Sequence, residues 1–288
     1  MGRVLHVEEW PELVDPVLVY SFTGWVDAGL AGMGTLELLI EQIGDQTGDQ
    51  TGEAGGGRFG AIDLTDLLDL QQTRPTVRLE HGDVRRIVWP EVELWAGHLG
   101  RDVICVRGPE PSIRWPAFAQ WVVDIAGHLR VREAYALGGM PAVITHRRPV
   151  PVLASATRRS VAQEVGPLRD DYLGATGLNT IVQHALGEAG VRSIALWAQV
   201  PQYVSGSPSP PAVRSLAARL GDLARLEIDL GAVDVRAAAY RDKVEEGLSE
   251  RPDVLAIVDQ IDEQLDQRIP SADELASEIE QYLRGRDE

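Results

Sequence analysis

The residues from Val17 to Gly29 constrain the fold of this chain more than any other segment. A short apolar run, Val17–Phe22, has the length and composition of a buried β-strand. A tight turn and then a helical pattern follow, with Gly24 and Gly29 relieving steric limits and Asp27 placed to cap the helix. This is the repeating unit of α/β proteins, and such turns often bind ligands because unpaired helix amides converge there.

Strand and helix signals alternate along most of the chain, which favours a sheet covered by helices on both faces. Strands are predicted at 3–7, 17–22, 58–62, 77–80, 91–96, 103–107, 133–137, 150–155, 193–200 and 226–230. Helices are predicted at 28–43, 64–71, 113–129, 161–164, 178–189 and 213–223. Residues 44–57 carry an imperfect Gly-Asp-Gln-Thr repeat, and this acidic, glycine-rich segment is predicted to be a loop.

After about Gly231 the pattern becomes almost purely helical. We therefore expect an α/β domain over residues 1–231 and an acidic, helical C-terminal appendage over residues 232–288.

The charge balance excludes several classes of partner. A net charge of -17 argues against a nucleic-acid or anionic-membrane binder, because repulsion would act at every approach. The N-terminus lacks the basic and apolar regions of a secretion signal, and no apolar run has the length of a membrane span. The sequence therefore predicts a cytoplasmic protein. Cys105, the only cysteine, lies in an apolar run and is expected to be a buried, unreactive thiol.

Two stretches carry opposite charge. Residues 74–159 contain 13 arginines against 8 acids, and residues 242–288 contain 15 acids against 5 bases. One interpretation is that the charges are scattered on solvated faces. The other is a surface for self-association or for a partner protein.

Three loops that follow apolar strands are predicted to line one cleft: 24–29, 138–148 and 174–179. Such loops gather at the carboxyl ends of strands in an open sheet. Their helix N-termini and arginines are suited to binding a phosphate or a carboxylate. The candidate ligand-binding residues are Gly24, Trp25, Asp27, Gly29, Gly138, Gly139, His146, Arg147, Arg148, Gly177, Gln202 and Tyr203. The same residues also fit a purely structural interpretation, as turn glycines, helix caps and surface arginines.

Catalytic and metal motifs are weak. His146 is a candidate for acid–base chemistry, but no nucleophile accompanies it in the sequence. The glycines of Gly29–Gly34 lie inside the predicted helix and do not have the dinucleotide-binding spacing. No arrangement of histidine, cysteine and acidic residues proposes zinc. We therefore expect neither a cofactor nor a metal, and we do not expect an enzyme.

Nine short motifs occur in a familiar order along the chain. They are Phe22–Gly29, Asp66–Asp69 with Arg74-Pro75, Trp89–Gly97, Arg107–Trp115, Leu137–Pro141, Thr145–Val152, Gly174–Gly177, Val200–Val204 and Ser271–Arg284. With these motifs the sequence resembles the bacterial branch of the proteasome assembly chaperone family, including its actinobacterial members. Two positions depart from the pattern, since Gln202 replaces a usual histidine and Ala175 a usual proline.

The resemblance implies a three-layer α/β sandwich with a central mixed sheet, similar to the phosphorylase/hydrolase-like class, followed by C-terminal helices. It also implies a non-enzymatic interaction factor with a chaperone-like role in assembly of the proteasome or another complex. The implied partners are a second copy of the chain, in a homo-oligomer such as a trimer, and proteasome subunits. The alternatives are a small-molecule binder or hydrolase that uses the predicted cleft, and a purely structural homo-oligomer.

The C-terminal sequence bears on how a proteasome would be contacted. Several activators and archaeal relatives of the family dock through a tail that ends hydrophobic–Tyr–any residue. This chain has Asp287 at the penultimate position and its last tyrosine at Tyr282. Burying an aspartate in a pocket built for tyrosine is costly, so any such contact is predicted to use a folded surface.

Overall fold

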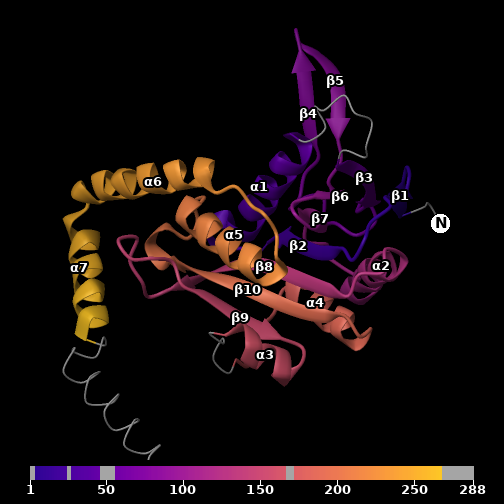
Figure 1. Cartoon of the computed structure of the whole chain (residues 1–288). Helices are drawn as coiled ribbons and strands as arrows, with labels where there is room; N and C mark the ends of the chain where they lie inside the picture. The colour runs from indigo at the N-terminus through magenta and orange to yellow at the C-terminus, as the bar shows by residue number, and fades with distance from the viewer. Residues whose placement is uncertain (1–3, 25–26, 46–55, 167–171, 268–288) are drawn as a thin grey trace, which may run out of the picture.

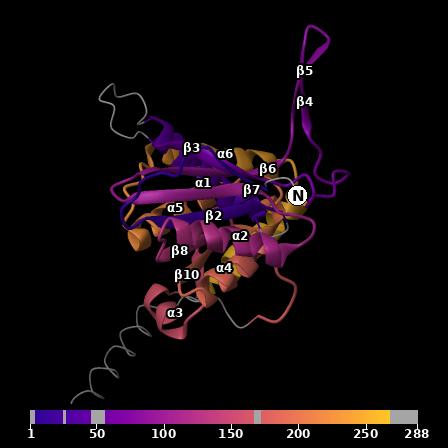
Figure 2. The same ribbon diagram turned by 90° about the vertical axis from the view of Figure 1, so that its right-hand side faces the viewer.

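The computed structural model describes residues 4–24, 27–45, 56–166 and 172–267. Within these residues, the centre of the molecule is an eight-stranded mixed sheet with the strand order β1-β3-β6-β7-β2-β8-β10-β9 (Figures 1 and 2). Its strands are β1 (Leu5–Val7), β2 (Val17–Thr23), β3 (Gly57–Asp63), β6 (Glu91–His98), β7 (Asp102–Pro109), β8 (Glu133–Ala142), β9 (Val152–Ala156) and β10 (Arg192–Pro201). A separate antiparallel hairpin consists of β4 (Thr76–Glu80) and β5 (Asp83–Val88).

Strands β7, β2, β8 and β10 form the parallel centre of the sheet. Strands β6, β3 and β1 continue it in antiparallel fashion on one side, and β9 closes the other side. The carboxyl ends of four strands therefore meet at one edge, as the predicted α/β class requires.

Helices cover both faces of this sheet. They are α1 (Ala31–Asp45) after the 3-10 turn η1 (Ala28–Leu30), α2 (Trp115–His128), α3 (Arg159–Val165), α4 (Leu178–Glu188), and α5 (Pro210–Ala224) after the 3-10 turn η3 (Gln202–Val204). Helices α1, α3 and α5 pack on one face, and α2 and α4 pack on the other. The expected three-layer α/β sandwich with a central mixed sheet is confirmed.

Strand β2 shows why the sequence forms three layers. Its side chains alternate between the two faces, and all of its residues from Val17 to Phe22 are buried. Val17 and Val19 pack with α1 and α5, while Leu18, Tyr20 and Phe22 pack with α2 and α4. Each buried side chain of this size contributes about 1.5–3 kcal/mol through removal of apolar surface from water.

The segment predicted as a helix at 64–71 is a series of turns. Asp63 accepts hydrogen bonds from the backbone and hydroxyl of Thr65, and the Asp69 side chain accepts the backbone N–H of Gln71. Aspartate side chains that capture nearby amides offer the backbone an alternative to the helix. The helical prediction is therefore wrong for this segment.

Two strand predictions also differ from the structure. Residues 226–230 do not form a strand, because Gln42 satisfies both the N–H and the carbonyl of Asp229 with its side-chain amide. Strand β5 was not predicted, since the adjacent Arg85 and Arg86 interrupt its alternation.

Beyond α5 the chain continues as α6 (Gly231–Ser249) and α7 (Pro252–Gln267), which we call the C-terminal arm. Figure 1 shows α6 passing over α5 and α7 turning away from the sheet. Helix α6 begins where the predicted appendage begins, and the division into two domains stays a prediction. The motif Ser271–Arg284 of the predicted helical appendage lies outside the described residues. No helix in the described part of the chain is both long and apolar enough to cross a bilayer.

Candidate functional site

The turn after β2 is a buried junction centred on Asp27, whose exposed fraction is 6%. Its Oδ1 accepts the N–H of Gly32 at 2.7 Å, and its Oδ2 accepts the N–H of Met33 at 3.1 Å. The predicted cap is confirmed, because these amides belong to the first turn of α1. Burial raises the pKa of Asp27 to about 6, and the amides that donate to it oppose that rise.

The predicted glycines Gly138 and Gly139 lie inside β8 and not in a loop. Asp27 pairs with Gly139 in an isolated parallel bridge. A Cβ at Gly139 would overlap the carbonyl oxygen of Ala28. Glycine is therefore needed here to let the turn approach the strand, and the two predicted segments do meet.

The next residues of the turn are Gly29 and Leu30, with φ of 68° and 47°. The Gly29 N–H donates to the Ser205 carbonyl and its own carbonyl accepts from the Ser209 N–H, both at 2.8 Å. Left-handed backbone is costly for leucine, and the side chain of Leu30 is nevertheless 46% exposed.

Leu30 borders a groove of about 190 Å³ between α1, α5 and α6, which we call the α1 groove. The apolar side chains that line it are Leu30, Met33, Leu38, Pro208, Pro210, Val213 and Val233. Glu37 and Glu41 lie on its rim and are exposed, and Arg236 lies there too. Sequence reasoning missed this groove, because its walls come from three segments far apart in the chain.

Gly24 lies at the carboxyl ends of β2 and β7, in a cavity of about 430 Å³ that also contains Glu110. Glu110 Oε1 accepts the N–H of Leu178 at 2.5 Å, next to Gly177, which is the buried N-cap residue of α4. Burial raises the pKa of Glu110, and the bond from Leu178 opposes that rise. The N-terminus of α4 is therefore capped by a carboxylate of the chain. Trp25 lies outside the described residues.

His146, in the loop between β8 and β9, contacts Tyr203 of η3. The Tyr203 hydroxyl accepts the backbone N–H of His146 at 2.9 Å and lies 2.7 Å from its Nδ1. The ring Nε2 lies 3.1 Å from Glu245 of α6. Burial lowers the pKa of His146 below its ordinary value, and the nearby Glu245 opposes that effect. Gln202 is exposed beside Tyr203.

Arg147 and Arg148 are paired with acids of the C-terminal arm. Arg147 binds Glu245 and Asp259, with Nη1 at 2.7 Å from Asp259. Arg148 binds Asp262 at 2.9 Å and Asp266 at 2.6 Å. The Thr145 hydroxyl also donates to Asp262 at 2.6 Å. We call this set of residues the ionic clasp. Its hydrogen bonds raise the pKa of both guanidinium groups, which stay charged.

The groups that were predicted to bind an anion already have carboxylate partners within the chain. The helix N-termini at α1 and α4 are capped by Asp27 and Glu110, and both arginines bind carboxylates of the arm. An anion would have to displace these partners. The opposed charges seen in the sequence therefore meet, at least in part, within one chain.

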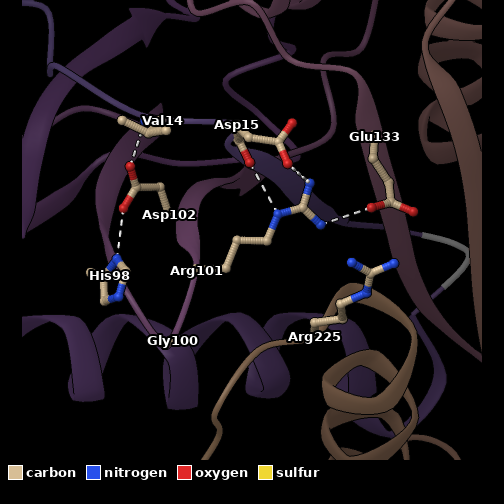
Figure 3. Close-up of a pocket in the computed structure, with 8 residues that line it drawn as sticks. All are labelled: Val14, Asp15, His98, Gly100, Arg101, Asp102, Glu133 and Arg225. Carbon is tan, nitrogen blue, oxygen red and sulfur yellow. Dashed lines mark hydrogen bonds and ion pairs between the residues drawn. The ribbon is translucent and has the colours of Figure 1, made fainter.

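The largest of these cavities, about 690 Å³, lies at the amino ends of the parallel strands (Figure 3). Arg101 crosses it, donating to the Asp15 carbonyl at 3.0 Å and to Glu133 at 2.8 Å. Asp102 accepts the N–H of Val14 on its Oδ2 at 2.6 Å, and its Oδ1 lies 2.7 Å from Nδ1 of His98. These charged groups bind one another across the starts of β2, β7 and β8, which is a structural role. Ligands of open α/β sheets bind at the opposite edge.

The remaining candidates for chemistry are metal-binding groups and the thiol of Cys105. No group of three or more histidine, cysteine or acidic side chains in that part of the chain is arranged to hold a metal. Cys105 is fully buried in β7, as predicted, and burial raises the pKa of its thiol to about 12.

Comparison with known proteins gives the family. Residues 21–248 match the family model described as PAC2 family. The chain belongs to the PAC2 family. The match begins in β2 and extends through almost all of α6, so it includes the Asp27 turn, the α1 groove and the first helix of the arm.

Solved structures agree with this assignment. A PAC2 family protein from Streptomyces avermitilis MA is 37% identical, with 81% of this chain and 95% of that chain covered and a TM-score of 0.73. A proteasome-assembly chaperone homologue from Mycobacterium tuberculosis is 29% identical, with 84% and 99% covered and a TM-score of 0.74. An archaeal proteasome activator from Pyrococcus furiosus shares the fold at 19% identity, with 84% and 97% covered and a TM-score of 0.63. No curated protein is significantly similar to the chain.

Proposed function

We propose that this protein is a non-enzymatic, chaperone-like interaction factor that acts in the cytoplasm on assembly of the proteasome or of another complex. Membership of the PAC2 family and the likeness to a proteasome-assembly chaperone homologue support the general role. The observation that carries the proposal is the α1 groove, which presents an exposed leucine in left-handed backbone beside a buried, hydrogen-bonded junction.

The chemistry of the groove defines its partner. The walls are apolar, and the exposed Glu37 and Glu41 outnumber Arg236 among the charged residues of the groove. A volume of about 190 Å³ is suited to one or two apolar side chains and not to a large metabolite. The proposed occupant is therefore an apolar anchor of a partner protein, flanked by lysine or arginine.

Leu30 offers a test that preserves the fold. Asparagine tolerates left-handed backbone, so Leu30→Asn removes the apolar anchor point without adding strain. Val143, also exposed, lies after β8 and supplies the matched control Val143→Asn. Binding of each protein to purified proteasome core subunits of the same organism would be measured by calorimetry.

The unmodified protein is expected to bind a core subunit, Leu30→Asn to bind at least tenfold more weakly, about 1.4 kcal/mol, and Val143→Asn to bind unchanged. Deletion of Arg286–Glu288 should leave the affinity within about twofold, because a folded surface and not the tail makes the contact. Equal affinity of Leu30→Asn and the unmodified protein would contradict the groove. Absence of binding to every core subunit would contradict the proteasome as the complex assembled.

The alternative, a small-molecule binder or hydrolase, rests on the cavity that contains Gly24 and Glu110. Glu110 is the charged residue among those that line this cavity, so a ligand there would be neutral or cationic and not a phosphate. A rise in melting temperature with inorganic phosphate, lost on changing Arg147 and Arg148 to alanine, would instead support the anion site predicted from the sequence.

A further inference from the structure

The hairpin of β4 and β5 stands away from the rest of the molecule. Figures 1 and 2 show it as a two-stranded ribbon that projects beyond the sheet and its helices. Each of its residues whose side-chain exposure is described, at 76–79, 83, 84 and 86–88, is exposed. The hairpin is therefore not packed on the body by either of its faces.

The register of the hairpin gives it one apolar face. Val77 pairs with Ile87, and Leu79 pairs with Val84 across a bulge that keeps the alternation in phase. These four side chains lie on the same face, with exposed fractions of 56%, 52%, 58% and 64% in that order. The opposite face carries Thr76 and Val88 as one pair and Arg78 and Arg86 as the next.

An isolated two-stranded ribbon is marginally stable in water, because it has no core to bury its apolar side chains. An exposed apolar strand pair is also a site of unwanted association. A partner that covers the apolar face would remove both problems, provided that it is always present with the protein. A second copy of the chain is always present with it.

Charge favours the same partner. The hairpin residues 76–88 carry three arginines against one glutamate and one aspartate, a net charge of +1, whereas the whole chain has a net charge of -17. The hairpin is thus a basic extension of an acidic protein, and another copy presents the opposite charge to it. Trp89, 48% exposed, follows β5 directly and extends the apolar face toward the body.

We infer that the apolar face of the β4–β5 hairpin docks on a second copy of this chain and holds the homo-oligomer together. The contact buries Val77, Leu79, Val84 and Ile87, and it brings the arginines on the other face of the narrow ribbon near the acidic surface of that copy. This inference is independent of the proposed role in assembly, since it concerns self-association and involves a surface other than the α1 groove.

Val77→Thr with Val84→Thr tests the contact. Threonine is isosteric with valine and equally suited to strands, so the hairpin keeps its shape while the face becomes polar. Val88→Thr is the matched control on the opposite face of the same ribbon. The mass of each protein would be measured by analytical ultracentrifugation across micromolar concentrations, with circular dichroism to confirm folding.

The unmodified protein and Val88→Thr are expected to be oligomers, and the double variant to dissociate at least tenfold more readily. A monomeric unmodified protein, an unchanged double variant or equal weakening by Val88→Thr would each overturn the inference.

A crosslink locates the contact directly. Because Cys105 is buried and no other cysteine exists, His81→Cys at the tip of the hairpin gives one accessible thiol for a photoreactive crosslinker. In a mixture of ¹⁴N- and ¹⁵N-labelled protein, crosslinks that join the two isotopes support the inference. Crosslinks confined to single chains overturn it.

Discussion

In the α/β body, helices α1, α2, α4 and α5 press fully buried leucines, isoleucines and valines against both faces of the sheet. In the C-terminal arm, the buried side chains of α6 and α7 are Val233, Ala237, Leu248 and Val258. The contact of the arm with the β8–β9 loop is instead the ionic clasp. Salt does not weaken apolar burial by screening, whereas it does screen partly exposed ion pairs. The two regions of one chain should therefore respond to different changes in the solvent.

The largest effect is expected in the body, at the junction of the turn with β8. Gly139→Ala places a methyl group against the Ala28 carbonyl, and backbone on both sides leaves no room to relax. We expect a loss of at least about 4 kcal/mol in the free energy of unfolding, or no folded protein. Gly127→Ala in α2 is the control, because its Cβ would meet open space and should stabilise by up to about 1 kcal/mol. Urea denaturation measures both, and a Gly139→Ala protein of normal stability would contradict the tight junction.

The second effect concerns pH. The pKa of Asp27 rises from its ordinary value of 3.8 to about 6 on folding, because burial disfavours the charge. The folded state then binds the proton more tightly than the unfolded state. Protonation of Asp27 therefore makes its full contribution to the free energy of unfolding below about pH 4. It is lost as the pH rises from 4 to 6, by up to about 3 kcal/mol.

Asp27→Asn cannot titrate and should remove that part of the pH dependence. Denaturation of both proteins at a series of pH values from 4 to 7 gives the difference directly. Parallel curves would show that Asp27 has the same pKa in the folded and unfolded states.

The smallest effect is expected in the arm. Asp262→Asn weakens the contacts of Asp262 with Thr145, Arg147 and Arg148, which together are worth about 1–2 kcal/mol of local stability. Amide exchange over residues 252–267 should speed up about tenfold, and 1 M NaCl should produce a similar change in the unmodified protein. Exchange in β2 and β8 should not change.

Asp253→Asn is the control for the arm, because Asp253 pairs with Arg251 on the arm itself. If the arm stays protected in the Asp262→Asn variant, apolar contacts and not charges hold it. The arm and the body would then be held by the same kind of contact.

The parts of the fold that depend on local pattern were predictable. The alternating apolar signals gave the strands of the central sheet with small shifts at their ends, except that β8 continues to Ala142 instead of ending at Leu137. The spacing of apolar residues gave α1, α2, α4 and α5. The errors at 64–71 and 226–230 have a common cause. In each segment, polar side chains take over hydrogen bonds that a helix or a sheet would have made. Asp69 does this with the nearby Gln71, whereas Gln42 does it with Asp229, a distant partner that a local pattern does not reveal.

The candidate site was predictable as a set of residues but not as an arrangement. Asp27 was correctly expected to cap α1, and its meeting with Gly139 follows from the close pairing of strand and turn. Arg147 and Arg148 were expected to face an anion, whereas they bind Asp259, Asp262 and other acids of the arm. The opposed charges of the two stretches were the available signal, but charge alone does not say whether its counterpart lies on the same chain.

The sequence by itself determined the α/β class, the strand–turn–helix unit at Val17–Gly29, the inert burial of Cys105 and the family. Each depends on short-range order, in which neighbouring residues fix the backbone and the face that must leave water. Only the tertiary structure decided that the α1 groove exists, that the arm closes over the arginines of the β8–β9 loop, and that the hairpin faces solvent on both sides. Those features depend on which distant segments pack together, because burial and charge pairing are properties of the assembled surfaces and not of the segments alone.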